Sequence, residues 1–161
     1  MAPEIRKVDY MNPQQSADML MLLNHYALDP MGGNEPLPQN VQDSLIQELQ
    51  KRSHVSSAIA YVDGTPAALV NYMEGFSTFA AKPLINVHDL VVHVDFRGQG
   101  LSHQLLAFVE SEAQECGCCK VTLEVLAENE IAKQSYQKFG FKPFQLTDAG
   151  GPAQFWQKKL G

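Results

Sequence analysis

The stretch from Val94 to Ser102 combines two glycines with an arginine, at a point where a strand is expected to run into a helix. Gly98 and Gly100 allow the backbone to approach a ligand closely, and the first amide N–H groups of a helix have no partner inside that helix. The helix N-terminus also carries a partial positive charge, to which Arg97 adds a full one. We therefore expect this stretch to bind an anion, with a diphosphate as the favoured case.

Two other phosphate-binding turns fit the sequence less well. A P-loop requires a Gly-x-x-x-x-Gly-Lys-Ser/Thr run, and the chain contains none. A dinucleotide-binding turn requires a third glycine, but Ser102 and His103 stand where it would fall. No obvious acidic residue ends a second strand about twenty residues later. The sequence therefore argues against phosphoryl transfer from ATP or GTP and against a dinucleotide fold.

A second pair of polar residues lies further along the chain. Asn129 and Tyr136 are seven positions apart, which on a helix is about two turns, or roughly 10 Å along one face. Taken singly, such an asparagine is typical of a helix N-cap and such a tyrosine of a half-buried phenol. Taken together, the two side chains can contact one bound molecule.

Three motifs together resemble the GNAT acyltransferase superfamily. They are His88-Asp89-Leu90-Val91-Val92, then Arg97-Gly98-Gln99-Gly100-Leu101-Ser102, then Asn129-x-x-Ala132-x-x-x-Tyr136-x-x-x-Gly140-Phe141. The superfamily signature at the diphosphate turn is Arg/Gln-x-x-Gly-x-Gly/Ala. Arg97, Gly100 and Ser102 fill that frame, with serine as a small departure. Within the superfamily, the segment is most similar to the diamine and polyamine N-acetyltransferases.

The resemblance implies an N-acetyltransferase that uses acetyl-CoA as its acyl-donor cosubstrate. Such a protein transfers the acetyl group to a primary amine, here of a small cationic molecule, by direct attack in a ternary complex. Two alternatives stay open: an amino acid, antibiotic or protein amine as the acceptor, or a non-catalytic module that only binds acyl-CoA. The implied partner is a small-molecule amine, and folds of this kind are compatible with a homodimer.

The resemblance also implies roles for individual residues. Leu90, Val91 and Val92 would line the pantetheine arm with their backbone groups, and a backbone N–H near Val91 would stabilise the oxyanion. The other implied cofactor-binding residues are Arg97, Gly98, Gln99, Gly100, Leu101, Ser102, His103, Asn129 and Tyr136. Tyr136 would also act as the general acid that protonates the departing thiolate.

The general base is expected at His88, where similar polyamine enzymes tend to carry glutamate. Neutral histidine has a reference pKa of about 6.5 and can accept a proton directly or through water. Asp89, Glu74 and Glu124 are the alternatives.

The composition is that of one globular domain over residues 1–161. Of the 161 residues, 45% are hydrophobic and 19% are charged, which is ordinary for a folded domain. The net charge of −6 argues against a nucleic-acid binder, which needs a basic surface, and is compatible with a cationic substrate. No apolar run reaches the roughly 18 residues that span a bilayer, and no signal-type segment follows the N-terminus. We therefore expect a cytoplasmic protein with no membrane partner.

Three cysteines lie within four positions, at Cys116, Cys118 and Cys119. Their odd number and close spacing suit neither a disulfide framework nor the four ligands of structural zinc. We expect reduced thiols and no metal site.

Apolar periodicity and turn signals predict the order of the elements. The expected strands are 5–9, 57–62, 67–73, 85–94, 120–126, 141–146 and 154–160, and the expected helices are 13–26, 41–49, 101–116 and 129–139. Asp63-Gly64 predicts a tight hairpin turn, and 76–83 is expected to be a loop. The inner side of the third helix is expected to hold Leu101, Leu105, Phe108, Val109, Ala113 and Cys116.

This order predicts a mixed α/β (α+β) fold of GNAT type. Its central twisted sheet would be mostly antiparallel, with about six to seven strands, one parallel βαβ crossover and about four helices. The crossover would carry the glycine turn.

Overall fold

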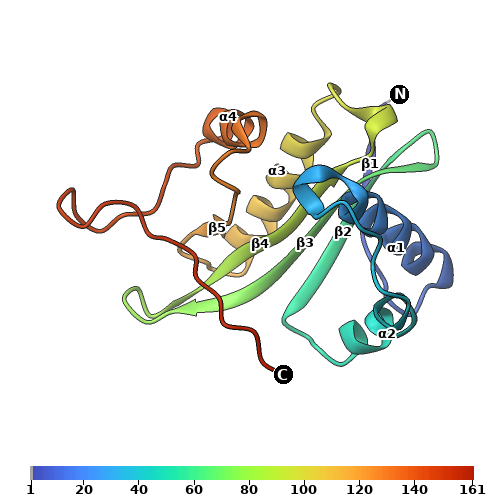
Figure 1. Cartoon of the computed structure of the whole chain (residues 1–161), viewed down its shortest axis with the longest axis horizontal. Helices are drawn as coiled ribbons and strands as arrows, with labels where there is room; N and C mark the ends of the chain where they lie inside the picture. The colour runs from blue at the N-terminus through green and yellow to red at the C-terminus, as the bar shows by residue number, and fades with distance from the viewer. Residues whose placement is uncertain (1) are drawn as a thin grey trace. The chain divides into compact units, whose positions relative to one another are not determined.

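The computed structural model describes residues 2–161 of the chain (Figure 1). These residues form two compact units, which meet in the sequence between Leu123 and Glu124. The first unit holds every described strand and three of the α-helices, and the second holds α4 (Glu130–Phe139) and the C-terminal segment. That residues 1–161 act as one domain stays a prediction.

The first unit is built on one five-stranded sheet in the order β1-β2-β3-β4-β5. The strands are β1 (Glu4–Lys7), β2 (Val55–Val62), β3 (Thr65–Ser77), β4 (Lys82–Val92) and β5 (Val121–Leu123). Neighbouring strands are antiparallel, except that β4 and β5 run parallel. A parallel pair requires a crossover, which helix α3 provides, so the predicted mixed α/β fold with one βαβ unit is confirmed.

Helices cover both faces of this sheet (Figure 1). They are α1 (Pro13–Leu28), α2 (Gln39–Gln50) and α3 (Leu101–Glu115), with short 3-10 turns η1 (Pro30–Gly32) and η2 (Val94–Phe96). Met19 and Leu22 of α1 share a buried cluster with Leu69 of β3 and Val91 of β4, and α2 packs against the same cluster. Because side chains alternate along a strand, Val70 points to the opposite face, which α3 covers.

The start of α1 follows from its sequence. Asn12 Oδ1 accepts hydrogen bonds from the amides of Gln14 and Gln15, at 3.0 and 3.1 Å. Pro13, which has no N–H to satisfy, occupies the first helical position. The predicted cap is therefore confirmed, and the helix continues two residues beyond the predicted end at Tyr26.

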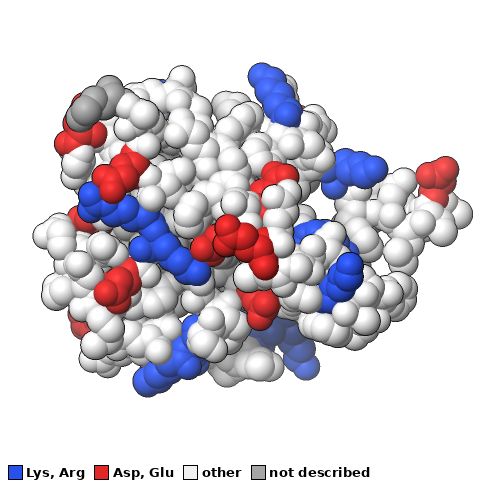
Figure 2. All heavy atoms as spheres, turned by 180° about the vertical axis from the view of Figure 1, so that it is seen from behind, with Lys and Arg blue, Asp and Glu red and all other residues white. Residues whose placement is uncertain are grey.

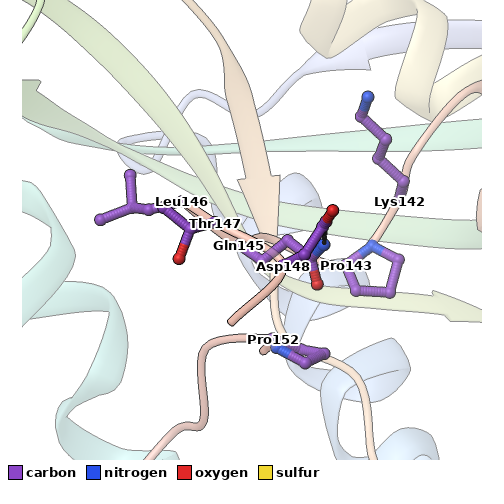
Figure 3. Close-up of a pocket in the computed structure, with 7 residues that line it drawn as sticks. All are labelled: Lys142, Pro143, Gln145, Leu146, Thr147, Asp148 and Pro152. Carbon is purple, nitrogen blue, oxygen red and sulfur yellow. Dashed lines mark hydrogen bonds between the residues drawn. The ribbon is translucent and has the colours of Figure 1, made fainter. Parts of the chain in front are cut away.

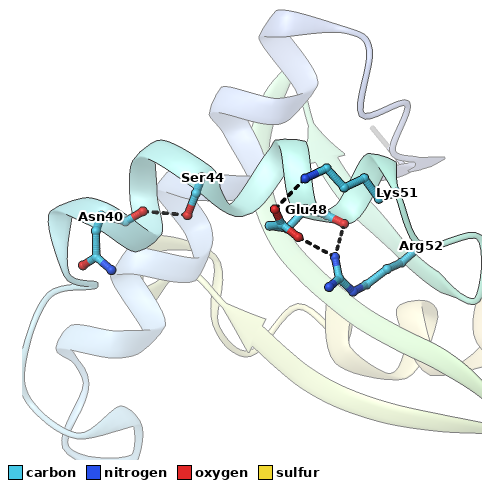
Figure 4. Close-up of polar contacts among 5 residues, drawn as sticks. All are labelled: Asn40, Ser44, Glu48, Lys51 and Arg52. Carbon is cyan, nitrogen blue, oxygen red and sulfur yellow. Dashed lines mark hydrogen bonds and ion pairs between the residues drawn. The ribbon is translucent and has the colours of Figure 1, made fainter. Parts of the chain in front are cut away.

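The C-terminal turn of α2 is held by two ion pairs (Figure 4). Glu48 accepts from Lys51 and from Arg52, each at 2.8 Å, and these hydrogen bonds lower the pKa of Glu48 to about 2. One turn earlier, Ser44 Oγ donates to Asn40 O at 2.6 Å. Because Glu48 is exposed to solvent, these pairs order the helix end and add little to the free energy of unfolding.

The two hairpins differ in how well the sequence predicts them. Between β2 and β3, Asp63 and Gly64 have φ of 49° and 77°, so the predicted two-residue turn is confirmed. Between β3 and β4, the expected loop at 76–83 is wrong, because Phe76 pairs with Pro83 and Ser77 with Lys82. The segment has no strand periodicity of its own, but two strands already in register extend their ladder to a short turn.

The predicted C-terminal strands are wrong. Residues 141–146 and 154–160 form no strand, and β5 ends at Leu123, so the sheet has five strands instead of six to seven. One hydrogen bond of the expected pair is present, from Ala153 N–H to Phe144 O at 2.7 Å. Pro143 and Pro152 have no N–H to donate, and two glycines precede Pro152, so the ladder is interrupted.

Helix α3 buries nearly the side that the sequence predicts. Its buried residues are Leu101, Leu105, Leu106, Val109 and Ala113. Cys116 is exposed instead of lying on the inner side, because α3 ends at Glu115 and Cys116 only caps it. Leu106 takes part in the core in addition to the predicted residues.

Candidate active site

The chain leaves β4 at Val92 and reaches α3 through a turn that contains Gly98 and Gly100. Their φ angles are 80° and 76°, in the left-handed region that glycine enters without strain. Gly100 is the N-cap residue of α3. The predicted strand to Val94 is two residues too long, because Val94 begins η2.

The N-terminus of α3 offers backbone donors to a ligand. The first helical hydrogen bond runs from Gln104 N–H to Gly100 O at 3.1 Å, so the amides of Leu101 and Ser102 precede the helical pattern. Gly100 has no side chain that could cap them. With the dipole of a 15-residue helix behind them, these donors fit an anionic group. The Leu101 side chain is itself buried, so only its amide can serve.

Arg97 lies beside this turn and is held from two sides. Its Nε donates to Val92 O at 3.3 Å, and Nη2 donates to Asp29 Oδ2 at 3.2 Å. Asp29 follows α1, so the ion pair joins the α1–α2 connection to the turn. A guanidinium has five N–H donors, and those not used in these two bonds remain for a ligand. The sequence predicts the position of Arg97 but does not indicate Asp29, which is 68 residues away.

Strand β4 parts from β5 along its second half. The β4–β5 pairing ends at Val87 with Leu123, whereas on its other side β4 stays paired with β3 as far as Val92. Among the described strands of the first unit, β4 therefore has no neighbour on its β5 side beyond Val87. The resemblance implies such a separation, and the pairing shows it.

A β-bulge at His88 accompanies this separation. Asn71 of β3 pairs with Asp89, and Tyr72 pairs with Val87, so His88 has no partner in β3. An extra residue in one strand shifts the alternation of that strand by one.

The bulge exchanges the sides to which β4 presents its backbone groups. Before it, Ile85 N–H donates to Lys120 O on the β5 side, at 3.2 Å. After it, His93 N–H donates to Ala67 O on the β3 side, at 2.8 Å. In a regular strand, residues 85 and 93 would donate to the same side, because they are an even number of positions apart.

The alternation after the bulge determines which residues can meet a ligand through their backbone. It places the backbone groups of Val91 in the β3 ladder and directs those of Leu90 and Val92 to the open side. The expected oxyanion donor near Val91 is therefore the backbone N–H of Leu90 or of Val92.

The two polar residues at the bulge differ in their surroundings. His88 is exposed, whereas Asp89 is half-buried and accepts a hydrogen bond from Asn71 Nδ2 at 3.0 Å. Tyr26 of α1 lies near Asp89 and Asp29. Burial raises the pKa of its phenol most, and the two carboxylates raise it further.

Two histidines that the sequence analysis does not single out stack beside the turn. The rings of His25 in α1 and His93 after β4 have centroids 4.2 Å apart and an interplanar angle of 22°. Val94 N–H donates to His25 Nε2, and Asp95 N–H donates to His93 Nδ1, each at 3.3 Å. Both ring nitrogens are therefore acceptors and carry no proton. Like the Arg97–Asp29 pair, this stack connects α1 to the turn.

We expect His25 to make the free energy of unfolding fall as the pH drops below about 6.5. Burial, followed by the charges of His93 and Arg97, lowers the pKa of His25. Between the lowered folded pKa and the unfolded value of about 6.5, the unfolded chain holds more protons, so stability rises with pH. Urea unfolding at a series of pH values should show a smaller slope in His25→Gln than in the parent. Exposed His54 provides the matched control, because His54→Gln should keep the parent slope. Equal slopes in all three proteins would contradict the assignment.

Asn129 and Tyr136 lie in the second unit, on α4. Asn129 is the N-cap, and its Oδ1 accepts from Ala132 N–H at 3.2 Å. Tyr136 is half-buried and meets Phe141 edge to face, with centroids 6.1 Å apart. The predicted helix is confirmed, and both residues have the local roles typical of their types. Their roles toward a ligand stay predictions.

The second unit also contains an open pocket of about 460 Å³, lined by residues between Lys142 and Pro152 (Figure 3). Gln145 Nε2 donates to Asp148 Oδ1 at 3.3 Å across it. None of the site residues predicted from the sequence is among the described residues that line it. The pocket is therefore separate from the predicted chemistry.

Charged residues of both signs are interspersed on the face drawn in Figure 2. Within residues 2–161, no group of His, Cys, Asp and Glu side chains has the arrangement of a metal site. The same part of the chain has no helix long and apolar enough to cross a membrane.

A βαβ crossover whose first helical amides precede the helical hydrogen bonds, next to a strand that leaves one side open, is an arrangement that fits a phosphate-bearing ligand. The sequence matches the model of the acetyltransferase (GNAT) family over residues 20–141. The chain therefore belongs to this family of N-acetyltransferases, which use acetyl-CoA. The predicted superfamily and enzyme class are confirmed.

Two relatives are similar to parts of the chain. It is 26% identical over 102 residues to the aminoglycoside N(6')-acetyltransferase type 1 of Salmonella typhimurium, a match that covers 60% of this chain and 68% of that protein. It is 32% identical over 56 residues to the uncharacterised N-acetyltransferase YycN of Bacillus subtilis, covering 35% and 36% of the two chains. The relatives do not show the closer resemblance to polyamine enzymes.

Solved structures share the fold. The aminoglycoside N-acetyltransferase AAC(6')-Iy in complex with CoA superposes with a TM-score of 0.76 at 19% identity, covering 99% of this chain and 96% of that one. A ribosomal-protein-alanine N-acetyltransferase from Brucella melitensis biovar Abortus 2308 has a TM-score of 0.72 at 19% identity, covering 99% and 98%. At such identities the likeness shows the fold alone.

Replacing Gly100 with alanine is expected to weaken CoA binding by roughly 10–100-fold. Alanine disfavours the left-handed φ of 76°, so the turn relaxes and shifts the amides that would bond the diphosphate. Gly117, which follows α3 with φ of 73°, offers the matched control. An added Cβ meets nothing within 4 Å at either glycine, so both substitutions carry a similar backbone strain of about 1–2 kcal/mol. Calorimetric titration should show weaker CoA binding for Gly100→Ala than for Gly117→Ala. Equal affinities of the two variants for CoA would mean that the diphosphate does not bind at this turn.

Proposed function

We propose that this chain transfers the acetyl group of acetyl-CoA to a primary amine of a small cationic molecule, by direct attack in a ternary complex. The observation that carries the proposal is the combination of two sets of backbone groups that lie outside the hydrogen-bond patterns of the helix and the sheet. The amides at the N-terminus of α3 fit the diphosphate, and the open side of β4 at Leu90 and Val92 fits the amide groups of the pantetheine arm. Acetyl-CoA supplies the activated thioester.

The residues would divide the binding and catalytic work as follows. Arg97, with the turn from Gly98 to His103, holds the diphosphate, and Asn129 positions the arm. A backbone N–H of Leu90 or Val92 stabilises the charge that develops on the carbonyl oxygen. Tyr136 donates a proton to the departing sulfur.

The proton acceptor is one of the two neighbours at the bulge. His88 is the candidate from the sequence, and its ring is exposed. The geometry supports Asp89 better, because its carboxylate is half-buried and oriented by Asn71. Glu74 lies opposite Ile85, before the bulge, whereas the part of β4 without a β5 neighbour lies after it. Glu74 is therefore a weaker candidate.

The acceptor is proposed to carry more than one positive charge. The Asp89 carboxylate lies near the phenol of Tyr26 in the open stretch of β4, and the chain has a net charge of −6, which favours a cationic acceptor. Diamines, polyamines and aminoglycosides share this chemistry of several protonated amines. The names of the relatives favour the aminoglycosides, and the motifs favour the polyamines.

A mass-spectrometric assay tests the proposal. The protein is mixed with acetyl-CoA and, separately, with polyamines, aminoglycosides, amino acids and peptides, and each amine is examined for a gain of one acetyl group. We expect protein-dependent product with polyamines or aminoglycosides, and a loss of product in Gly100→Ala at low acetyl-CoA concentration. Product only with amino acids or peptides would overturn the cationic small-molecule acceptor.

A further inference from the structure

We infer that Tyr10, Ser57 and Asn71 form a buried chain of hydrogen bonds whose function is to position Asp89 for proton transfer. The inference rests on the proposed transferase function. It adds three positioning residues that neither the motifs nor the family match indicate. They come from the connection before α1, from β2 and from β3.

The chain of contacts is continuous. Tyr10 Oη lies 2.8 Å from Ser57 Oγ, Ser57 Oγ donates to Asn71 Oδ1 at 2.6 Å, and Asn71 Nδ2 donates to Asp89 Oδ2 at 3.0 Å. Ser57 has one hydroxyl proton, which it gives to Asn71. The Tyr10 hydroxyl must therefore be the donor in the first bond.

The direction of these bonds matters for Asp89. An ionised carboxylate only accepts hydrogen bonds, so it requires the nitrogen end of the Asn71 amide. The carbonyl end of the same amide is held by Ser57, and Ser57 is in turn held by Tyr10. The amide therefore has one satisfied orientation, and that orientation presents a donor to Asp89.

The register of the sheet explains why the chain exists. Ser57 pairs with Asn71, and Asn71 pairs with Asp89, so the three side chains form one row across β2, β3 and β4. The next row on the same face contains Leu69 and Val91, which belong to the buried core.

The burial of this row indicates a role beyond packing. Ser57 is fully buried, and Asn71 is 7% exposed. Polar groups in such positions are costly unless every partner is present, and apolar residues would fill the row without that cost. Within residues 2–161, no buried side-chain nitrogen or oxygen lacks a partner. The polar row is thus completely satisfied, and its outer end is the carboxylate at the bulge.

The proposed step balances as follows. The acceptor ammonium gives one proton to the Asp89 carboxylate, and the neutral amine that results attacks the thioester carbonyl, so a C–N bond forms and the C–S bond breaks. The departing sulfur takes a proton from Tyr136, and the second amine proton is lost to solvent, which returns a proton to Tyr136. Asp89 then releases its proton to solvent and is ready for another turnover. The net products are the acetylated amine, free CoA and one proton.

The test is an exchange of the two bonded side chains. Asn71→Asp and Asp89→Asn are made singly and together, and the double variant keeps all hydrogen bonds, because Ser57 and Asn at position 89 both donate to Asp at position 71. Only the location of the carboxylate changes. We expect the double variant to fold, with an unfolding temperature below that of the parent because the carboxylate moves to a more buried position, and to lose at least roughly 100-fold in kcat, with KM for acetyl-CoA unchanged.

Ser57→Ala measures the positioning role separately, because it removes one link and leaves Asp89 in place. We expect a kcat about 10-fold lower, with folding and KM for acetyl-CoA retained. The matched control is Ser56→Ala, the neighbouring position whose side chain points to the other face of β2. It should keep the parent kcat.

Three results would overturn the inference. One is a double variant with the parent kcat, which would remove Asp89 from the reaction. Another is a Ser57→Ala protein whose stability falls while kcat stays at the parent value, which would make the chain structural only. The third is a parent protein that acetylates none of the tested amines, which would overturn the proposed function as well, and is recognised before any variant is made.

Discussion

Replacing Tyr136 with phenylalanine is expected to lower kcat for acetyl transfer by roughly 10²–10⁴-fold, the usual contribution of a general acid. The substitution removes one hydroxyl and keeps the ring, so the edge-to-face contact with Phe141 should persist. Affinity for CoA should stay within about twofold, because the lost group acts on the reacting sulfur and not on the diphosphate.

Tyr61→Phe is the matched control for this prediction. It also removes one phenolic hydroxyl, which donates to Asp18 Oδ2 at 2.8 Å, but from a buried position in β2. We expect it to lower the free energy of unfolding by about 1–3 kcal/mol, with kcat unchanged. Single-turnover acetyl transfer and calorimetric CoA titration measure the two quantities.

The transfer and binding measurements also distinguish an active acetyltransferase from a module that only binds acyl-CoA. A parent protein that binds CoA and transfers nothing would favour the module, and Tyr136→Phe would then have no activity to remove. Transfer that survives in Tyr136→Phe at the parent rate would instead assign the acid to another group.

Leu22→Ala is expected to lower the free energy of unfolding by about 2–5 kcal/mol. Leu22 is fully buried between α1 and the sheet, in the cluster that contains Leu69 and Val91. Truncation removes apolar contacts and leaves a cavity that the packed strands cannot close. Chemical denaturation monitored by circular dichroism would measure the loss.

Leu28→Ala on the same helix is the control. Leu28 is 50% exposed at the last position of α1, so its truncation should change stability by less than about 1 kcal/mol. Comparable losses in the two variants would mean that α1 is not packed on the sheet as described.

Local signals predict a large part of the first unit. Asn12-Pro13 marks the start of α1, Asp63-Gly64 marks a hairpin, and the glycines before α3 mark the turn. Each of these depends on residues within a few positions of one another, where backbone angles and caps decide the conformation. The glycine turn before α3, which is proposed to bind the diphosphate, is one of these locally determined features.

Contacts between distant segments are beyond such signals. Asp29 pairs with Arg97, and His25 stacks on His93, yet neither His25 in α1 nor Asp29 after it stands out in the local sequence. The bulge at His88 is hidden for the same reason. It is defined by the pairing with the partner strand. The resemblance therefore implies Leu90, Val91 and Val92 without showing that the backbone groups of Val91 belong to the β3 ladder.

The predicted C-terminal strands are an error of the opposite kind, because the sequence predicts elements that the structure does not contain. Residues 141–146 and 154–160 have apolar residues with the composition of strands, but an isolated pair of strands is marginal. Two prolines within the segment remove donors that a ladder would need. Composition indicates what a segment could form, and the available hydrogen bonds decide whether it does.

The bulge at His88 has a consequence for solubility as well as for chemistry. Unpaired strand edges invite other chains to add to them, and proteins usually restrict them. Here β4 is an inner strand up to Val87 and becomes an edge only from there to Val92, where the chain turns away. Such a short interval can accept an extended ligand of a few atoms' length, but it gives another polypeptide too few rungs to hold. This part of β4 therefore favours a short extended ligand over a further strand.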